Sequence, residues 1–322
     1  MPMKSWDFTT LGSTMLSLTT DPGVPFLSSV GLRLDVAGAE SNCAIALARL
    51  GKRVSWHSKV ASGTLGERVI SGIRAHGVDV ASVIRSDEGR AEQMWVEAGG
   101  GDNPTTISYD REGASVESLR IDEIDLRSLH DSQYFHATGI TPALSEDSRN
   151  AVLDAVQLAC KAGTKVSFDV NYRSKLWEPS RAQEVLSTII PGIHILFIKE
   201  TDLEMLWSRR GNAETEMRRL QEEFGIPNIV LTQSREGASA LLGDHFESHP
   251  AFRGEAVSPI GAGDALAAGV LYSLMEDEEA LALKRGCAMA SLARQSRSDY
   301  VVGGRQALDS RIQGEKGWEV LR

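Results

Sequence analysis

The stretch Val257-Ser258-Pro259-Ile260-Gly261-Ala262-Gly263-Asp264-Ala265-Leu266-Ala267-Ala268-Gly269 is the part of the chain around which the fold can be read. Pro259 and the nearby glycines predict a turn, and the small apolar residues that follow predict a helix from Ala262 to Met275. A helix that begins on Gly-Ala-Gly exposes backbone N–H groups that no side chain covers, and the helix dipole adds partial positive charge. The sequence therefore predicts an anion-binding helix end.

Asp264 lies in the first turn of this predicted helix, so its carboxylate can face whatever the N–H groups hold. This arrangement suits phosphoryl transfer to a hydroxyl, because the amides stabilise the transferred group while the carboxylate accepts the proton. The motif alone also allows a plainer reading, in which Asp264 caps the helix and the two glycines only shape a tight turn.

Composition narrows the class of protein. The 322 residues carry a net charge of −10, so nucleic acid or an anionic membrane is not expected as a partner. The three cysteines, Cys43, Cys160 and Cys287, are far apart and show no metal-ligand spacing, which predicts reduced thiols. No signal-like or membrane-spanning run is present in the sequence, and we expect a cytoplasmic location.

From about residue 133 the pattern alternates regularly between strands and helices. Strands are predicted at 133–137, 165–170, 193–198 and 228–232, and helices at about 146–162, 180–189, 201–208 and 213–224. Such alternation predicts a parallel sheet with helices on both faces. Ligands of these folds bind at the carboxyl ends of the strands, where the sequence places Asp169 and Asn171, Lys199 and Glu200, and Thr232 to Ser234.

The N-terminal third is less regular. Residues 54–60 predict one strand, and residues 19–37 and 91–117 predict short antiparallel strands that could form a flap over a site. Neither a GxxxxGK[ST] loop nor a GxGxxG motif is present, which disfavours a P-loop or dinucleotide fold.

Taken in order, several segments resemble the ribokinase/PfkB family of sugar kinases, and within it the 2-keto-3-deoxygluconate kinases. Gly261-Ala262-Gly263-Asp264 matches the core of the family's C-terminal signature. The other matching segments are 37–42 (Ala-Gly-Ala-Glu-Ser-Asn), 46–51, 137–144 and 168–177 (Phe-Asp-Val-Asn-Tyr-Arg-Ser-Lys-Leu-Trp). The resemblance covers about residues 7–310.

The resemblance implies a single kinase domain over residues 1–322. Its fold would be a doubly wound, mostly parallel α/β sheet with helices on both faces and a small β-sheet lid from about 13–37 and 91–117. It also implies ATP with Mg²⁺, phosphorylation of a hydroxyl of a sugar or sugar acid, and assembly as a homo-oligomer, a dimer or higher.

The resemblance also assigns roles to individual residues. Asp264 would be the catalytic base, and Gly261, Ala262 and Gly263 the anion hole. The expected sugar-binding residues are Gly38, Asn42, Tyr109, Arg111, Asn171 and Arg173. The expected nucleotide-binding residues are Thr232, Ser234 and Gly237 together with Gly261 and Gly263, and Asp202 would serve the metal. The guanidinium groups suit a sugar-acid carboxylate. Plainer roles remain open: Arg111 as a solvated lid charge, Arg173 in an ion pair with Asp169, and Asn42 as a helix cap.

Five places in the sequence depart from the family pattern, and one of them is Ala61-Ser62-Gly63, which stands where Gly-x-Asp is usual after the second strand. Ser258 stands where an Asp usually helps to hold a monovalent cation, and Ser234 stands where the nucleotide loop usually has glycine. The metal-associated Asn-x-x-Glu appears as Lys199-Glu200-Thr201-Asp202. A Thr-Gly-Leu-Tyr segment has become Ala91-Glu92-Gln93-Met94, so one expected sugar-contacting tyrosine is missing.

Three functions therefore stay open from sequence. The first is a kinase for 2-keto-3-deoxygluconate or a related keto sugar acid. The second is a neutral-sugar or nucleoside kinase of the same family. The third is a kinase-fold protein with weak or no catalysis that binds a sugar or nucleotide.

Overall fold

The computed structural model describes residues 4–100, 103–254, 256–258 and 260–314. Pro259, part of the predicted turn before the helix, lies outside these residues. Among the residues that are described, no helix is both long and apolar enough to cross a membrane.

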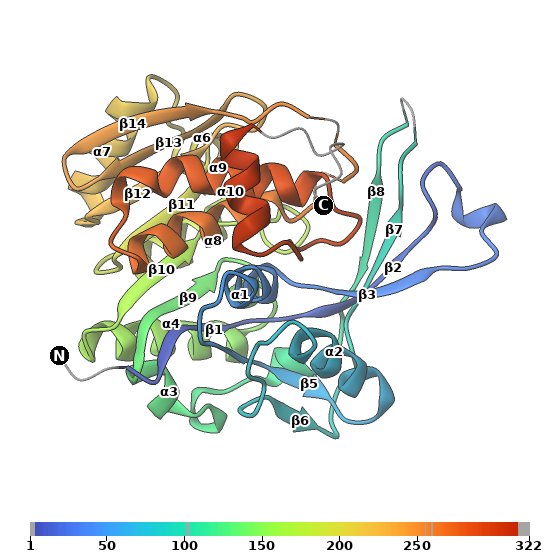
Figure 1. Cartoon of the computed structure of the whole chain (residues 1–322). Coiled ribbons are helices and arrows are strands. Elements are labelled where there is room, and N and C mark those ends of the chain that lie inside the picture. The colour runs from blue at the N-terminus through green and yellow to red at the C-terminus, as the bar shows by residue number, and fades with distance from the viewer. Residues whose placement is uncertain (1–3, 101–102, 255, 259, 315–322) are drawn as a thin grey trace.

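An eight-stranded sheet forms the centre of the molecule, with strand order β14-β13-β12-β11-β10-β9-β1-β4 (Figure 1). Its strands are β1 (Trp6–Leu11), β4 (Val54–His57), β9 (Ser132–Thr138), β10 (Lys165–Asp169), β11 (Ile195–Lys199), β12 (Asn228–Thr232), β13 (Gly237–Leu242) and β14 (His245–Pro250). The pairs from β4 to β12 are all parallel, and β13 and β14 complete the edge as an antiparallel hairpin. The predicted parallel sheet is confirmed.

Helices cover both faces of this sheet and create two apolar cores. One core joins one face of the sheet to α1 (Ala39–Arg49), α2 (Thr64–Arg74), α8 (Ala262–Met275) and α9 (Ala282–Arg294), and α10 (Arg305–Gln313) packs outside α9. The other core joins the opposite face to α3 (Leu126–His130), α4 (Glu146–Lys161), α5 (Pro179–Ile189), α6 (Glu200–Trp207) and α7 (Ala213–Phe224). Strand residues alternate between them: Phe197 belongs to the first core, and Leu196 and Ile198 belong to the second.

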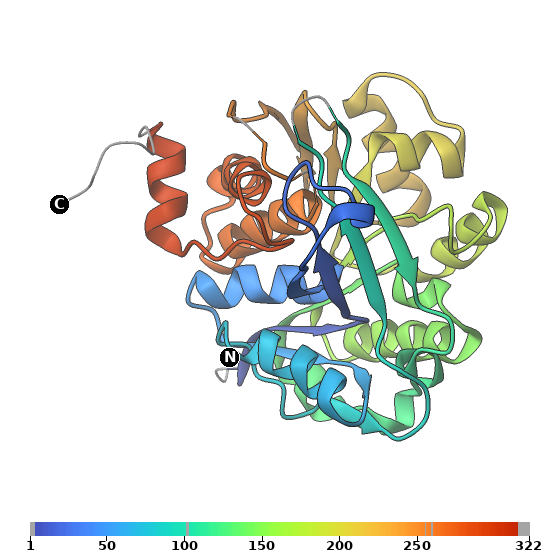
Figure 2. The same cartoon turned by 90° about the vertical axis from the view of Figure 1, so that its right-hand side faces the viewer.

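A second sheet of four strands stands away from the main body (Figures 1 and 2), and we call it the lid. It has the order β3-β2-β7-β8, with β2 (Met15–Thr19), β3 (Arg33–Ala37), β7 (Gln93–Glu97) and β8 (Thr106–Asp110). The outer pairs are antiparallel, as the sequence predicted, but β2 and β7 pair in parallel. Because these two central strands are distant in sequence, local patterning did not reveal that pairing.

One predicted strand is wrong. Residues 54–60 form two strands, β4 in the main sheet and β5 (Lys59–Ala61) in a separate two-stranded sheet with β6 (Ile84–Ser86). The chain leaves the main sheet at Ser58, whose carbonyl accepts a hydrogen bond from the Ile84 N–H at 2.9 Å. A continuous β-prone run cannot show that its two ends have different neighbours.

Candidate active site

The N-terminus of α8 is built around glycine. Gly261 is the residue before the helix and has φ of +76°, and a Cβ there would lie 1.7 Å from the Asp299 carbonyl oxygen. A Cβ on Gly263 would instead meet no atom within 4 Å. Gly261 therefore packs closely against the backbone at Asp299, whereas the space beside Gly263 is open. The N–H groups at the start of the helix can bind an anion in this open space.

Asp264 is held in this turn by two amides. The Asn42 side chain, from α1, donates a hydrogen bond of 2.8 Å to Asp264 Oδ2, and Asn171, just after β10, also hydrogen bonds to the carboxylate. Burial raises the pKa of Asp264, while the hydrogen bonds from Asn42 and Asn171 oppose that rise. The alternative of Asn42 as a helix cap is wrong, since Gly38 is the residue before α1 and no described side chain caps the helix. The Asn42 amide instead orients the Asp264 carboxylate at the helix end that would bind the phosphate.

The backbone after β10 is shaped to present Asn171. Asn171 has φ of +38°, a left-handed conformation that asparagine tolerates better than most residues. Its N–H donates to Asp169 Oδ1 at 3.0 Å, and its own side-chain oxygen has no hydrogen-bond partner. Burial raises the pKa of Asp169 to about 7, and the nearby Asp264 adds to the rise.

Two half-buried cations face this group of acids. Arg173 and Lys199 each lower the pKa of Asp169, Asp202 and Asp264 through their charge. Neither cation forms an ion pair within 4.0 Å with another described residue, so the alternative of an Arg173–Asp169 ion pair is not realised here. The sequence placed Lys199 at the carboxyl end of a predicted strand but gave it no role in the site, and the structure confirms that place at the end of β11.

The sugar-binding positions on α1 are tightly enclosed. A Cβ on Gly38, the residue before the helix, would lie 2.4 Å from the Ser13 carbonyl oxygen and 2.7 Å from Thr14 Oγ1. Glu40, which the sequence reasoning did not select, is fully buried in the first turn and accepts hydrogen bonds from Thr138 and Thr141. Small size at Gly38 thus lets the start of the helix approach the lid.

The lid carries Tyr109 on its last strand, β8, and Arg111 directly after that strand. The Arg111 guanidinium lies 5.0 Å from the centre of the Tyr109 ring, and its Nη1 lies 3.3 Å from Glu92 Oε2. The Arg111 side chain is only 11% exposed, so it is a buried ion-pair member and the alternative of a solvated lid charge is wrong. The sequence gave Glu92 no role, because the departure of residues 91–94 from the family pattern indicated only that a tyrosine is missing.

Three of the predicted nucleotide-binding residues, Thr232, Ser234 and Gly237, lie at the turn between β12 and β13, whereas Gly261 and Gly263 lie at the start of α8. Thr232 ends β12, Ser234 has φ of +55°, and the Gln233 N–H donates to the Gly237 carbonyl oxygen at 2.9 Å. Gly237 has φ of +119°, and a Cβ there would lie 2.1 Å from the His249 carbonyl oxygen. The chain thus keeps the backbone shape of a glycine turn even with serine at position 234.

Asp202 is the predicted metal-associated residue. Its carboxylate is buried beside the end of β10 and accepts the Tyr172 N–H at 3.2 Å, and burial raises its pKa. In the part of the chain that is described, no three His, Cys, Asp or Glu residues form a group that could hold a metal ion by themselves. The residues fit Mg²⁺ nonetheless, because this ion commonly uses one or two carboxylates, water and substrate phosphates.

The fold and this geometry define a phosphotransferase: an open helix N-terminus, an oriented carboxylate and unpaired cations at the carboxyl ends of parallel strands. Residues 23–302 match the family described as pfkB family carbohydrate kinase. The chain is 36% identical to a 2-dehydro-3-deoxygalactonokinase of Haloferax volcanii, over 92% of this chain and 93% of that one.

Solved structures agree in fold. A 2-dehydro-3-deoxygluconokinase of Thermotoga maritima has a TM-score of 0.89 at 22% identity, covering 97% of this chain and 100% of the other. An E. coli protein solved with ATP and Mg²⁺ has a TM-score of 0.86 at 21% identity, covering 96% and 99%. The chain belongs to the PfkB family and is an ATP-dependent carbohydrate kinase. The ribokinase-like fold expected from sequence is confirmed.

Proposed function

We propose that this protein transfers the γ-phosphate of ATP to a hydroxyl of a keto sugar acid of the 2-keto-3-deoxygluconate and 2-keto-3-deoxygalactonate class. The observation that carries this proposal is the pair of unpaired, half-buried cations, Arg173 and Lys199, beside Asp264. Two unpaired cations in a chain of net charge −10 are explained by anionic ligands. The names of the relatives support the same substrate class.

In this proposal Asp264 is the general base. Its carboxylate, fixed by Asn42 and Asn171, takes the proton of the attacking hydroxyl. The N–H groups of the first turn, from Ala262 to Asp264, stabilise the transferred phosphoryl group. Asp202, with Asp169 nearby, would hold Mg²⁺, which neutralises phosphate charge when bound.

Further features belong to the same proposal. We assign residues 1–322 to one kinase domain, with segments 13–37 and 91–117 forming its lid. Gly38 and Asn42 would contact the sugar from α1, Tyr109 and Arg111 from the lid, and Thr232, Ser234 and Gly237 would line the nucleotide site. We also propose a cytoplasmic homo-oligomer, which three widely separated cysteines and the exposed apolar residues of the lid support.

A coupled assay of ADP release tests the substrate class. The panel contains 2-keto-3-deoxygluconate, 2-keto-3-deoxygalactonate, fructose and ribose, each with ATP and Mg²⁺. We expect a clear preference for a sugar acid, and we expect Asp264→Asn to lower turnover by about 10²–10⁴ while ATP binding persists. Preference for a neutral sugar would favour a neutral-sugar or nucleoside kinase. The ion pair of Glu92 with Arg111 would fit that result, because Glu92 neutralises the charge of Arg111. Turnover of Asp264→Asn close to wild type would remove Asp264 from its role.

A further inference from the structure

Glu92 and Arg111 lie opposite each other at the base of the lid. Glu92 directly precedes β7 and Arg111 directly follows β8, and the strand register pairs Met94 with Tyr109 and Gln93 with Asp110. Side chains alternate along a strand, so Glu92 shares a face with Met94 and Val96. That face points toward the site, because Met94 and Val96 belong to a cluster that packs against Ile260, the residue before Gly261.

The pair is buried but not satisfied. The Glu92 side chain is 4% exposed and the Arg111 side chain 11%, and their 3.3 Å contact is the only ion pair that either forms with a described residue. Glu92 Oε2 and Arg111 Nη1, the same two atoms that form this ion pair, face each other without hydrogen-bond geometry, and neither has a hydrogen-bond partner among the described residues. Burial raises the pKa of Glu92, against the charge of Arg111 and a hydrogen bond from Ser13. Buried polar atoms normally form hydrogen bonds, so this acceptor and this donor each lack a hydrogen bond that a ligand inserted between them could supply.

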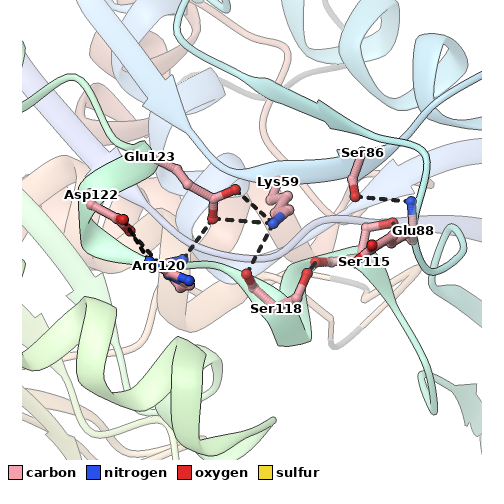
Figure 3. A network of polar contacts seen from close by, with 8 residues as sticks. All are labelled: Lys59, Ser86, Glu88, Ser115, Ser118, Arg120, Asp122 and Glu123. Carbon is pink, nitrogen blue, oxygen red and sulfur yellow. Dashed lines mark hydrogen bonds and ion pairs between the residues drawn. The ribbon is translucent and has the colours of Figure 1, made fainter.

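The base of the lid is rigidly held. Lys59, on β5, donates to the Ser118 carbonyl oxygen at 3.0 Å and to the Glu123 carboxylate at 2.8 Å (Figure 3). Ser115 Oγ donates to the Glu88 carbonyl oxygen at 2.8 Å, which joins the segment after β8 to the segment before β7. These contacts join the segment that follows Arg111 to β5 and to the segment that precedes Glu92, so the pair lies on a connected part of the lid in the structure without substrate.

We infer that Glu92 and Arg111 together bind one hydroxyl of the substrate by hydrogen bonds. This contact would determine which sugar acid the enzyme prefers. The hydroxyl donates to Glu92 Oε2 and accepts from Arg111 Nη1, which satisfies both unpaired atoms. This inference rests on the proposed function. The substrate carboxylate binds instead near Arg173, because a carboxylate at Arg111 would meet the charge of Glu92.

The inference has a consequence for specificity. A buried site that hydrogen-bonds a hydroxyl rejects a substrate that presents no hydroxyl there, because its own polar groups stay unpaired. 2-Keto-3-deoxygluconate and 2-keto-3-deoxygalactonate carry the same carboxylate and differ in the configuration of one hydroxyl. A comparison of the two sugar acids therefore tests recognition of the hydroxyl separately from recognition of the carboxylate.

The experiment compares kcat/KM for the two sugar acids in wild type, Glu92→Gln and Arg173→Met, with Glu112→Gln as the matched control. Glu112 is an exposed lid acid next to Arg111, so its variant removes the same charge without touching the pair. Calorimetric binding of each sugar acid to the same proteins gives a readout apart from turnover, and thermal unfolding confirms that each variant is folded.

We expect wild type to prefer one sugar acid at least tenfold and Glu92→Gln to reduce that preference to about threefold or less, by loss of the preferred substrate. Arg173→Met is expected to weaken both sugar acids alike, and Glu112→Gln to change neither. Three outcomes overturn this inference but leave the proposed function standing. They are a ratio of kcat/KM for the two sugar acids that Glu92→Gln leaves unchanged, a wild type with equal kcat/KM for both, or an equal rise in kcat/KM for both in Glu92→Gln. A wild type that uses only neutral sugars, with no loss in Arg173→Met, overturns the proposed function and this inference with it.

Discussion

At the scale of single residues, Lys199 lies where the proposed nucleotide and sugar sites adjoin. It ends β11 directly beside Thr232 of β12, and two residues earlier Phe197 lies beside Asp169 of β10. Its ammonium group is half-buried and has no ion pair within 4.0 Å in the described part of the chain. The family pattern has a neutral asparagine where this chain has Lys199. This chain therefore carries one more positive charge between the proposed nucleotide and sugar sites.

We expect Lys199→Met to lower kcat/KM for ATP at least tenfold, because a charge-assisted hydrogen bond contributes about 1.5–3 kcal/mol. The loss of ATP affinity is expected to be larger without Mg²⁺, when the phosphates are least neutralised. Steady-state kinetics and calorimetric titration of ATP with and without Mg²⁺ measure both effects. Lys175→Met, which removes an exposed lysine, is the control. Unchanged affinity in Lys199→Met would limit Lys199 to balancing the buried acids.

Asp264 gives a second prediction at this scale, in the pH dependence of catalysis. Burial raises its pKa, and the base must be ionised, so the acid limb of kcat/KM is expected above the ordinary aspartate pKa of about 3.9. Asn171→Ala removes a hydrogen bond that favours the ionised form, so the limb is expected to move to higher pH. A pH–rate profile from pH 4 to 9 measures the shift. If the acid limb of kcat/KM in Asn171→Ala moves to lower pH or does not move, this role of Asn171 is contradicted.

At the scale of elements, helix α1 contains a buried acid that links stability to pH. Burial raises the pKa of Glu40 to about 7, against an unfolded value of about 4.3. The folded chain therefore holds a proton that the unfolded chain releases. The stability that this proton gives is complete below the unfolded pKa and is lost as pH rises through about 7.

Glu40→Gln keeps an acceptor for Thr138 and Thr141 but cannot ionise. We expect its free energy of unfolding to fall less steeply between pH 5 and 8 than that of wild type, with a difference of at most about 3 kcal/mol at pH 8. Asp169 and Asp299 carry raised pKa values of about 7 and give a slope of the same sign in both proteins. Urea unfolding at several pH values measures the slopes, and parallel slopes would exclude Glu40 as a contributor.

The turn between β12 and β13 provides a test of backbone strain. Ser234 adopts φ of +55°, which for a residue with a Cβ costs about 1–2 kcal/mol. Ser234→Gly removes this strain where the family pattern has glycine, so we expect an equal or higher melting temperature and a lower KM for ATP. Ser208→Gly, at φ of +53° at the end of α6, relieves similar strain away from this turn and controls for stability alone. A KM that rises in Ser234→Gly would show that the hydroxyl itself binds the nucleotide.

The elements that sequence predicted best are those with strong local signals. Strand β12 and helix α8 have the predicted bounds, because apolar patterning and the Gly-Ala-Gly start are local features. The division at Ser58 and the parallel pairing of β2 with β7 depend on distant partners and were not accessible. The same holds for the site: the motif named Asp264, but the Arg111–Glu92 ion pair appears only when two lid strands are brought together.

At the scale of the whole molecule, the lid leaves apolar side chains in water. Leu27 and Val30 are fully exposed, at 102% and 107%, and Leu32 and Leu34 are about 40% exposed, at 38% and 42%. They lie on or before β3, which is the edge strand of the lid and pairs with a strand, β2, on one side only. An exposed apolar edge strand of this kind favours pairing with another chain. A second copy of this protein is the partner that we expect, since most soluble oligomers are homo-oligomers with a self-complementary interface.

We therefore expect a homodimer in which the two lids meet, and Leu32→Asp to dissociate it by placing a charge in the interface. Light scattering after size-exclusion chromatography over a range of protein concentrations measures the mass. Leu65→Asp, at a 49% exposed leucine on α2, is the control and is expected to leave the dimer intact. Because β3 leads directly into the start of α1, a dissociated lid is also expected to raise KM for the sugar acid more than KM for ATP. A wild type that stays monomeric at all concentrations would exclude the dimer. A dimer that Leu65→Asp disrupts and Leu32→Asp does not would place the contact between the two copies away from the lid.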